Sequence, residues 1–243
     1  SSSMYRGNKA QYGGGLHIFK SVNILLTYFL LDFNTAISLG GGVYISKGKS
    51  LTFWKIKCKQ NYATHMAGGL YVQDVTEIII NSWFSKNSAK ITGGGAVALI
   101  SITLGRIITS SFVANVADSN GGAVLLLDTQ KCSLLSANFI KNDAKGHGGA
   151  ISVQNTNNVT INQASFRGHH SNQQGGAIHL RNVAKFINRN CRYFFNVAKK
   201  DGGAVYFYGS KSSLYVLNSN VLFQNNSASL EGGAFKIIHL QHL

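Results

Sequence analysis

The segment FIKNDAKGHGGAISV, residues 139–153, carries the two motifs that decide the fold of this chain. One is an aromatic residue followed three positions later by Asn, and the other is a Gly-Gly pair followed by a small and an apolar residue. The pair recurs at intervals of 26 to 30 residues, and six of the eight intervals are 27. Self-similarity at such a period identifies a repeat architecture. The first glycines of the pairs are Gly14, Gly41, Gly68, Gly94, Gly121, Gly148, Gly175, Gly202 and Gly232.

The aromatic–Asn motif stands nine or ten residues before each Gly pair. Leu31 and Cys58 replace the ring in two units, and His169 replaces the Asn in another. Equivalent residues of stacked units form columns, so we expect an aromatic column and an amide ladder inside the stack. The Gly pairs are expected at bends of unusual φ where two backbones approach closely. The predicted ladder consists of Asn34, Asn61, Asn87, Asn115, Asn142, Asn196 and Asn226.

Each unit alternates apolar and polar residues in three short stretches separated by polar turns, which is a β pattern. Trp54, Ile56 and Cys58 are expected to face inward, with a lysine facing outward after each of them. A unit of 27 residues cannot bury its own apolar face, so the units must stack. We therefore predict an all-β fold, a right-handed parallel β-helix of about nine coils with three short strands per coil, forming one domain over residues 1–243.

Helical repeats are excluded because the units lack helical periodicity, and leucine-rich repeats because their leucine framework is absent. The pairing of the two motifs resembles the repeats of the polymorphic outer membrane protein family of chlamydiae. The resemblance extends over essentially the whole chain and implies a secreted β-helix that mediates adhesion. We expect a non-enzymatic cell-surface or extracellular β-helix protein that acts in adhesion or as a structural shaft or filament component. Its best matches are residues 94–97, 121–124, 148–151, 175–178 and 202–205.

The charge balance points to anionic partners. The formal net charge is +15, and the chain has only eight carboxylates. Such a balance favours acidic glycans, lipid head groups or nucleic acid, but nucleic acid is disfavoured because no known nucleic-acid-binding module is present and the aromatic residues fall mostly in inward columns. The longest apolar run, residues 22–31, is too short for a transmembrane helix. Three cysteines without CxxC spacing and scattered histidines predict no disulfide framework, no metal site and no cofactor.

Cationic residues recur seven to nine residues before several Gly pairs, so stacking is expected to align them as a ridge outside the third strand. The ridge is interpreted as a surface for acidic glycans, with a solvated face that limits aggregation as the alternative. Its predicted members are Lys59, Lys86, Lys141 and Arg167, extended by Arg189 and Arg192.

Two carboxylates are weak candidates for catalysis. Asp201 and Glu231 each precede a Gly pair one coil apart, a placement compatible with the carboxyl separation of a retaining glycosidase. The alternative to a surface protein is therefore a polysaccharide lyase- or hydrolase-like β-helix enzyme. The simpler interpretation of this position is a turn that accepts any polar residue, and the other acids are scattered along the chain.

Three further expectations concern the surface and the ends. Asn158 and Asn225 begin possible glycosylation sequons, with Asn158 expected in an exposed turn. The chain is expected to be a segment of a longer β-helix or to stack end to end with copies of itself. The one long unit, with extra residues near Tyr208 to Ser213, is expected to form a protruding loop.

Overall fold

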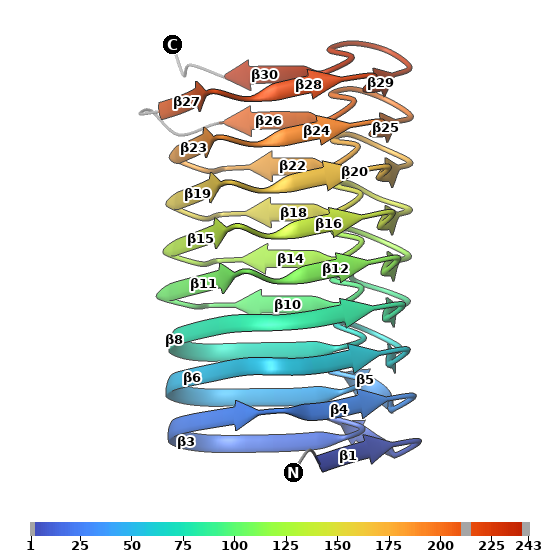
Figure 1. Ribbon diagram of the computed structural model, residues 1–243, viewed down its shortest axis with the longest axis vertical. Helices are drawn as coiled ribbons and strands as arrows, with labels where there is room; N and C mark the ends of the chain where they lie inside the picture. Colours follow the sequence, from blue (N-terminus) through green and yellow to red (C-terminus); the bar gives the residue numbers. More distant parts are fainter. Residues whose placement is uncertain (1–2, 210–214, 240–243) are drawn as a thin grey trace.

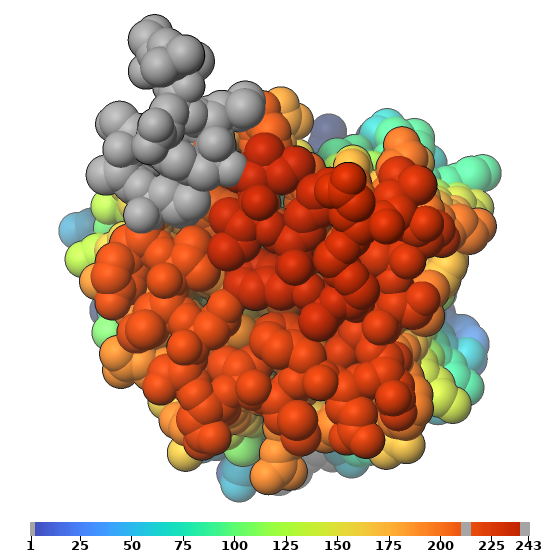
Figure 2. Space-filling model, turned by 90° about the horizontal axis from the view of Figure 1, so that it is seen from above, coloured from blue at the N-terminus to red at the C-terminus, as the bar shows by residue number. Residues whose placement is uncertain are grey.

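The computed structural model describes residues 3–209 and 215–239, and within them the chain winds as a parallel β-helix of about nine coils without any helix (Figure 1). Its strands form a 21-stranded sheet and a 9-stranded sheet, and every pairing joins a strand to the equivalent strand of the next coil in parallel. Seen along the axis, the coils lie over one another, so the last coil covers most of the others (Figure 2). The predicted fold class is confirmed.

The strands of the first four coils are β1 (Ser3–Arg6), β2 (Lys9–Tyr12), β3 (Leu16–Thr27), β4 (Phe29–Asp32), β5 (Thr35–Leu39), β6 (Val43–Lys59), β7 (Tyr62–Ala63), β8 (Leu70–Ser85) and β9 (Ser88–Ala89). Those of the next three are β10 (Val97–Ile100), β11 (Leu104–Ile108), β12 (Ser111–Val113), β13 (Val116–Ala117), β14 (Val124–Leu127), β15 (Lys131–Leu135), β16 (Asn138–Ile140), β17 (Asp143–Ala144), β18 (Ile151–Gln154), β19 (Asn158–Asn162), β20 (Ser165–Arg167) and β21 (His170–Ser171). The remaining strands are β22 (Ile178–Arg181), β23 (Lys185–Arg189), β24 (Arg192–Phe194), β25 (Val197–Ala198), β26 (Val205–Gly209), β27 (Tyr215–Ser219), β28 (Leu222–Gln224), β29 (Ser227–Ala228) and β30 (Phe235–His239).

A typical coil contains the three expected strands and a fourth, two-residue strand that the sequence pattern did not reveal. In the coil of β14, β15 and β16, the extra strand is β17, directly after the Asn column. Two residues are too few to display an alternating pattern, so the sequence indicates a loop at this place. In the early coils the strands run together, as in β6 and β8.

The strand register makes the repeat more regular than the glycine spacing suggested. The left-handed bend before the first strand is occupied by Gly40, Ala67 and Gly94, at equal intervals of 27 residues. The interval of 26 residues arises because the pair Gly68–Gly69 follows the bend residue Ala67, whereas the pair Gly94–Gly95 begins at the bend and is followed by Ala96. At the next position, a Cβ on Gly122 would lie 2.1 Å from the Gly149 carbonyl oxygen, so this close approach requires glycine.

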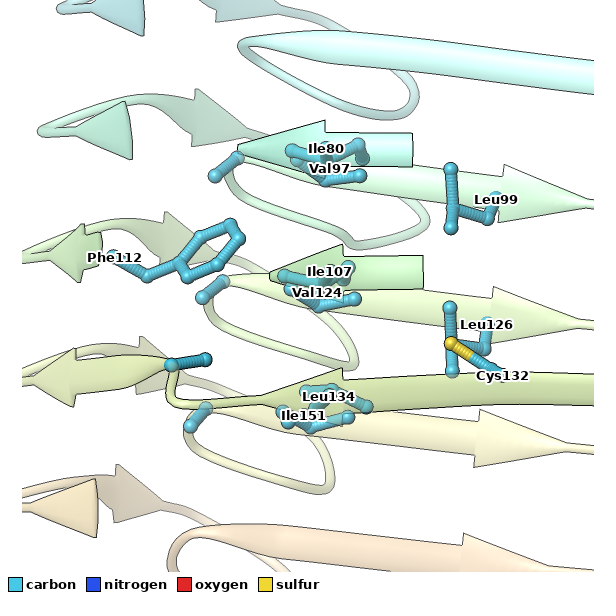
Figure 3. Packing of buried hydrophobic residues seen from close by; sticks show 14 of the residues in the cluster. Ile80, Val97, Leu99, Ile107, Phe112, Val124, Leu126, Cys132, Leu134 and Ile151 are labelled. Atoms are coloured by element: carbon cyan, nitrogen blue, oxygen red, sulfur yellow. The ribbon is translucent and has the colours of Figure 1, made fainter. Parts of the chain in front are cut away.

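Side chains of equivalent positions stack in columns along the axis. Figure 3 shows Ile80, Ile107 and Leu134 in one such column, beside Val97, Val124 and Ile151 in another. The aromatic column continues this order, since Phe112 and Phe139 are stacked with ring centroids 4.7 Å apart. This distance matches the spacing between neighbouring strands of a sheet, so ring stacking and strand pairing reinforce each other.

The Asn column forms a ladder of the predicted kind, and the contacts of Asn115 illustrate it. Its Nδ2 donates to Asn142 Oδ1 at 3.0 Å and to the Phe84 carbonyl at 3.1 Å. Its Oδ1 accepts from both Nδ2 and the backbone N of Asn87, each at 3.0 Å. Each amide of this kind therefore satisfies a buried corner without water, which explains why it follows the inward aromatic residue. Asn8 adds a rung below Asn34 at 2.9 Å.

His169 interrupts the ladder. Its Nδ1 accepts from the Asn142 backbone N–H at 3.0 Å, and its backbone N donates to Asn196 Oδ1 at 3.1 Å. The Nε2 atom is buried without a hydrogen bond of normal geometry. Complete burial lowers the pKa of this imidazole to about 3, so the ring is neutral in the folded chain at neutral pH.

The predicted inward position of Trp54 is wrong. The Trp54 side chain is 38% exposed, whereas Phe53 before it and Ile56 after it are buried. The chain bends at Lys55, which has φ 53°, and a bend of this kind breaks the two-residue alternation that the prediction assumed.

Candidate functional site

The predicted basic residues do not form one ridge. Lys59 and Arg167 occupy the same column of the third strand but lie four coils apart, with Ser85, Val113 and Ile140 between them. Lys86 and Lys141 occupy the adjacent bend position, where their φ angles are 53° and 50°. An offset of one residue in an extended chain changes the direction of the side chain, and the sequence offsets of these cations differ by up to two.

Arg189 and Arg192 stand in still other columns. Arg189 ends β23, on the preceding strand, and Arg192 begins β24 beside Ser165. All six predicted cations are exposed. The structure therefore divides them into two groups along the stack, one near the third and fourth coils and one near the sixth to eighth.

In the first group, Lys59 lies among exposed aromatic and cationic residues that we call the tryptophan corner. This corner consists of Tyr28, Trp54, Lys55, Lys57, Lys59 and Trp83, and does not include Lys86. Trp83 is 50% exposed and lies beside Lys57 in the neighbouring coil. Lys55 places its ammonium 5.4 Å from the ring centroid of Tyr28, a cation–π geometry. Core packing does not account for these exposed rings and the ammonium groups beside them, which makes the corner a candidate binding surface.

Two shallow hollows adjoin this corner. One of about 430 Å³ is lined by residues that include Tyr28, Lys55, Lys57 and Trp83. The other, of about 200 Å³, includes Lys57, Lys59 and Trp83 in its lining. Trp83 and Lys57 therefore line both hollows. The sequence contained a signal for this site in its only two tryptophans, but their outward direction depends on the bend at Lys55.

In the second group, Arg167 and Arg192 lie beside Phe194 and Phe195, and we call these four residues the arginine cluster. Arg189 is not part of it. The Arg167 guanidinium lies 5.8 Å from the ring centroid of Phe195, and Phe194 is the register partner of Arg167 on the next coil. Lys141 precedes Arg167 by one coil at the adjacent bend. Cationic and aromatic side chains therefore come together at this corner too, on a smaller surface.

The Asp201–Glu231 pair is held by a lysine. Lys236 Nζ lies 3.0 Å from Asp201 Oδ1 and 2.7 Å from Glu231 Oε2. These two contacts raise the pKa of Lys236, with the hydrogen bond to Glu231 the larger cause. The two carboxylates therefore belong to one ion-pair network around the Lys236 ammonium.

The position before the Gly pair has a structural role instead. Asn120 Oδ1 accepts from the backbone N–H of His147 at 2.9 Å, and Asp201 Oδ1 accepts from that of Glu231 at 3.2 Å. Asn120, His147 and Asp201 of this column therefore each accept a hydrogen bond from a backbone N–H in the next coil, a role that an amide, an imidazole or a carboxylate can fill.

Three of the other six carboxylates are also in ion pairs, Asp32 with Arg6, Glu77 with Arg106, and Asp118 with Lys145. A fourth, Asp143, lies with its Oδ2 3.1 Å from His170 Nδ1. Among the described residues, no three His, Cys, Asp or Glu side chains lie close enough together to hold a metal ion. The three cysteines are buried and free, and burial raises the pKa of Cys132 to about 12, as for an inert core thiol.

The two sequons differ in their surroundings. Asn158 was expected in an exposed turn, but it begins β19 and is half-buried between Lys131 and Lys185. Asn225 is exposed at a bend with φ 54°. The protruding loop predicted near Tyr208 to Ser213 lies largely outside the described residues.

Comparison with known families bears on the repeat itself. Residues 220–236 match the model of the Chlamydia polymorphic membrane protein repeat. This stretch includes Phe223, Asn226 and the Gly232 pair, whose equivalents in the other coils share the same columns. The match confirms the resemblance of the two motifs to this repeat family. Searches of curated proteins and of solved structures found no match. The described part of the chain contains no helix able to cross a membrane.

Proposed function

We propose that this chain is the shaft of a cell-surface or extracellular β-helix that adheres to acidic glycans without enzymatic action. The repeat match supports a surface protein of the β-helix type. The single observation that carries glycan binding is the tryptophan corner, where the exposed Trp83 lines two hollows whose walls include lysines.

The corner suits a chain of acidic sugars for a physical reason. The apolar face of a sugar ring packs on an exposed aromatic ring, while ammonium groups on either side pair with its carboxylates or sulfates. The arginine cluster, several coils away, adds a second contact for the same polymer, and two linked contacts bind more tightly than either alone. The net charge of +15 attracts such a polymer over a longer range.

The test is binding of polygalacturonate, with neutral dextran as the comparison, measured by calorimetry at two salt concentrations. Trp83→Ala is expected to weaken polygalacturonate binding about tenfold, the loss of roughly 1.4 kcal/mol. Tyr12→Ala, which removes another exposed aromatic ring outside the corner, is the matched control and should bind as the wild type. Affinity that does not change with salt, or with Trp83→Ala, would exclude the proposal.

A further inference from the structure

A separate polar hollow of about 330 Å³ lies on the outer face of β18, β22 and β26, away from the tryptophan corner. Its walls include Gln154, His179, Arg181, Tyr206 and Tyr208 from these strands. Side chains of the corner before the Gly pairs, His147 and Gln174 among them, close one side. The volume falls within the range of small-ligand sites.

In the earlier coils the same face is filled by apolar side chains. There the outward column passes through Tyr71, Ala98 and Leu125, which are buried in a small apolar cluster with Met66 and Leu127 beside them. In the later coils this column changes to Ser152, His179 and Tyr206. The hollow therefore begins where aliphatic packing is replaced by hydrogen-bonding side chains.

The floor of the hollow contains hydrogen-bonding capacity that the protein does not use. His179 is only 4% exposed, and its Nδ1 is buried without a hydrogen-bond partner. Its ring is stacked between His147, at 4.4 Å, and Tyr206, at 5.5 Å, so it is held in place. Ser152, the register partner of His179, also has a buried Oγ without a partner, but it does not line the hollow. Buried polar groups normally find partners, so the unsatisfied imidazole of His179, a lining residue, suggests a ligand.

The charge of the hollow is positive. Among the described residues no carboxylate lines it, whereas the Arg181 guanidinium does. Asp201, in the column of His147 and Gln174, is engaged by Lys236. Burial lowers the pKa of His147, and the charges of Lys200 and Arg181 lower it further. Burial lowers the pKa of His179 to about 3. At neutral pH the described part of the lining therefore consists of the Arg181 cation, neutral imidazoles, amides and phenols.

We propose that this hollow binds a single sugar ring that carries a carboxylate, such as a uronic acid residue. The carboxylate pairs with Arg181, and ring hydroxyls, which both donate and accept, pair with His179 and the amides of Gln154 and Gln174. A neutral sugar lacks the first contact and a simple carboxylate lacks the others, so selectivity needs both parts of the ligand. This site does not depend on the tryptophan corner.

The experiment titrates the intact chain with glucuronate, glucose and acetate, following binding by calorimetry and by amide chemical shifts. Glucuronate is expected to bind with a dissociation constant on the order of 1 mM, the value that ordinary ligand efficiency gives for one sugar ring. Shifts should concentrate on β18, β22 and β26. Arg181→Gln should weaken glucuronate binding roughly 10- to 100-fold, the range for a hydrogen bond to a charged group, and should leave glucose unaffected.

Two further variants make the result decisive. His179→Phe keeps the stacked column, as Tyr206 does in the next coil, and should weaken glucuronate and glucose alike. Lys9→Gln removes an exposed cation on β2, in the first coil, and should change neither. Equal affinity for glucuronate and glucose, unaltered binding in Arg181→Gln, or the absence of saturable binding would overturn the proposal. Trp83→Ala should bind glucuronate normally in this hollow, so failure here is distinguishable from failure of the corner.

Discussion

His169 is the weak rung of the amide ladder, and replacing it with Asn should stabilise the protein. In an uninterrupted rung, Nδ2 donates to the aromatic residue's carbonyl one coil below and to the next Asn Oδ1, as Asn115 Nδ2 donates to the Phe84 carbonyl at 3.1 Å and to Asn142 Oδ1 at 3.0 Å. An Asn at position 169 would make the same two bonds, to the Phe139 carbonyl and to Asn196 Oδ1. At roughly 0.5–1.5 kcal/mol each, they should stabilise the fold by about 1–3 kcal/mol at neutral pH.

The same substitution should remove part of the acid sensitivity of the fold. The pKa of His169 is about 3 in the folded chain against 6.5 unfolded, so the unfolded state binds more protons below pH 6.5. Stability therefore falls as the pH drops from 6.5 toward 3. At pH 5 this group should cost about 2 kcal/mol relative to neutral pH. His179, also with a pKa of about 3, adds a similar loss that His169→Asn retains.

The assay is urea unfolding at pH 7 and pH 5, followed by far-ultraviolet circular dichroism. Wild type should lose about 4 kcal/mol between the two pH values from these histidines together, and His169→Asn about half of that. His65→Asn, which removes an exposed imidazole, controls for the loss of a histidine as such. The reasoning is refuted if His169→Asn has the wild-type pH dependence, or if it is less stable than wild type at pH 7.

Three other substitutions test the packing of the coils by the same unfolding measurement. Gly122→Ala should destabilise the fold by more than about 2 kcal/mol, because its Cβ would meet the Gly149 carbonyl. Gly7→Ala, where φ is 67° but a Cβ would meet nothing within 4 Å, should cost only about 1 kcal/mol. Equal losses of stability in the two variants would contradict this reasoning. Phe112→Ala should cost about 3–5 kcal/mol by opening a gap between two stacked rings, and a loss below about 1 kcal/mol would mean that the column collapses to fill it. Asn115→Ala removes four buried hydrogen bonds and should cost at least about 3 kcal/mol; a neutral effect would show that water replaces the rung.

The period and the two motifs were readable from sequence because each is a local requirement repeated in every coil. Asn115 and its equivalents recur because every coil has the same buried corner with the same backbone groups to satisfy. Gly122 and its equivalents recur because every coil approaches the next one equally closely. A requirement that stacking imposes on each unit appears in the sequence as a spacing, so the fold class and the ladder followed from it.

The directions of surface side chains depended on the tertiary structure. Single residues in the left-handed region, such as Lys55 and Lys141, bend the chain and break the alternation that places a side chain inside or outside. Whether two cations share a column depends on these bends, so Lys59 and Lys86 were assigned to one ridge and lie in different columns.

The sequence by itself thus determined the repeat, the fold class and the identity of the inward columns, since these express interactions that every coil makes with the next. Only the tertiary structure decided where Trp83 projects, which cation joins Asp201 and Glu231, and where the outer face changes from apolar packing to the hollow above His179. These features depend on contacts between residues about 27 positions or more apart that occur once in the chain. A contact that is not repeated leaves no period in the sequence from which it could be predicted.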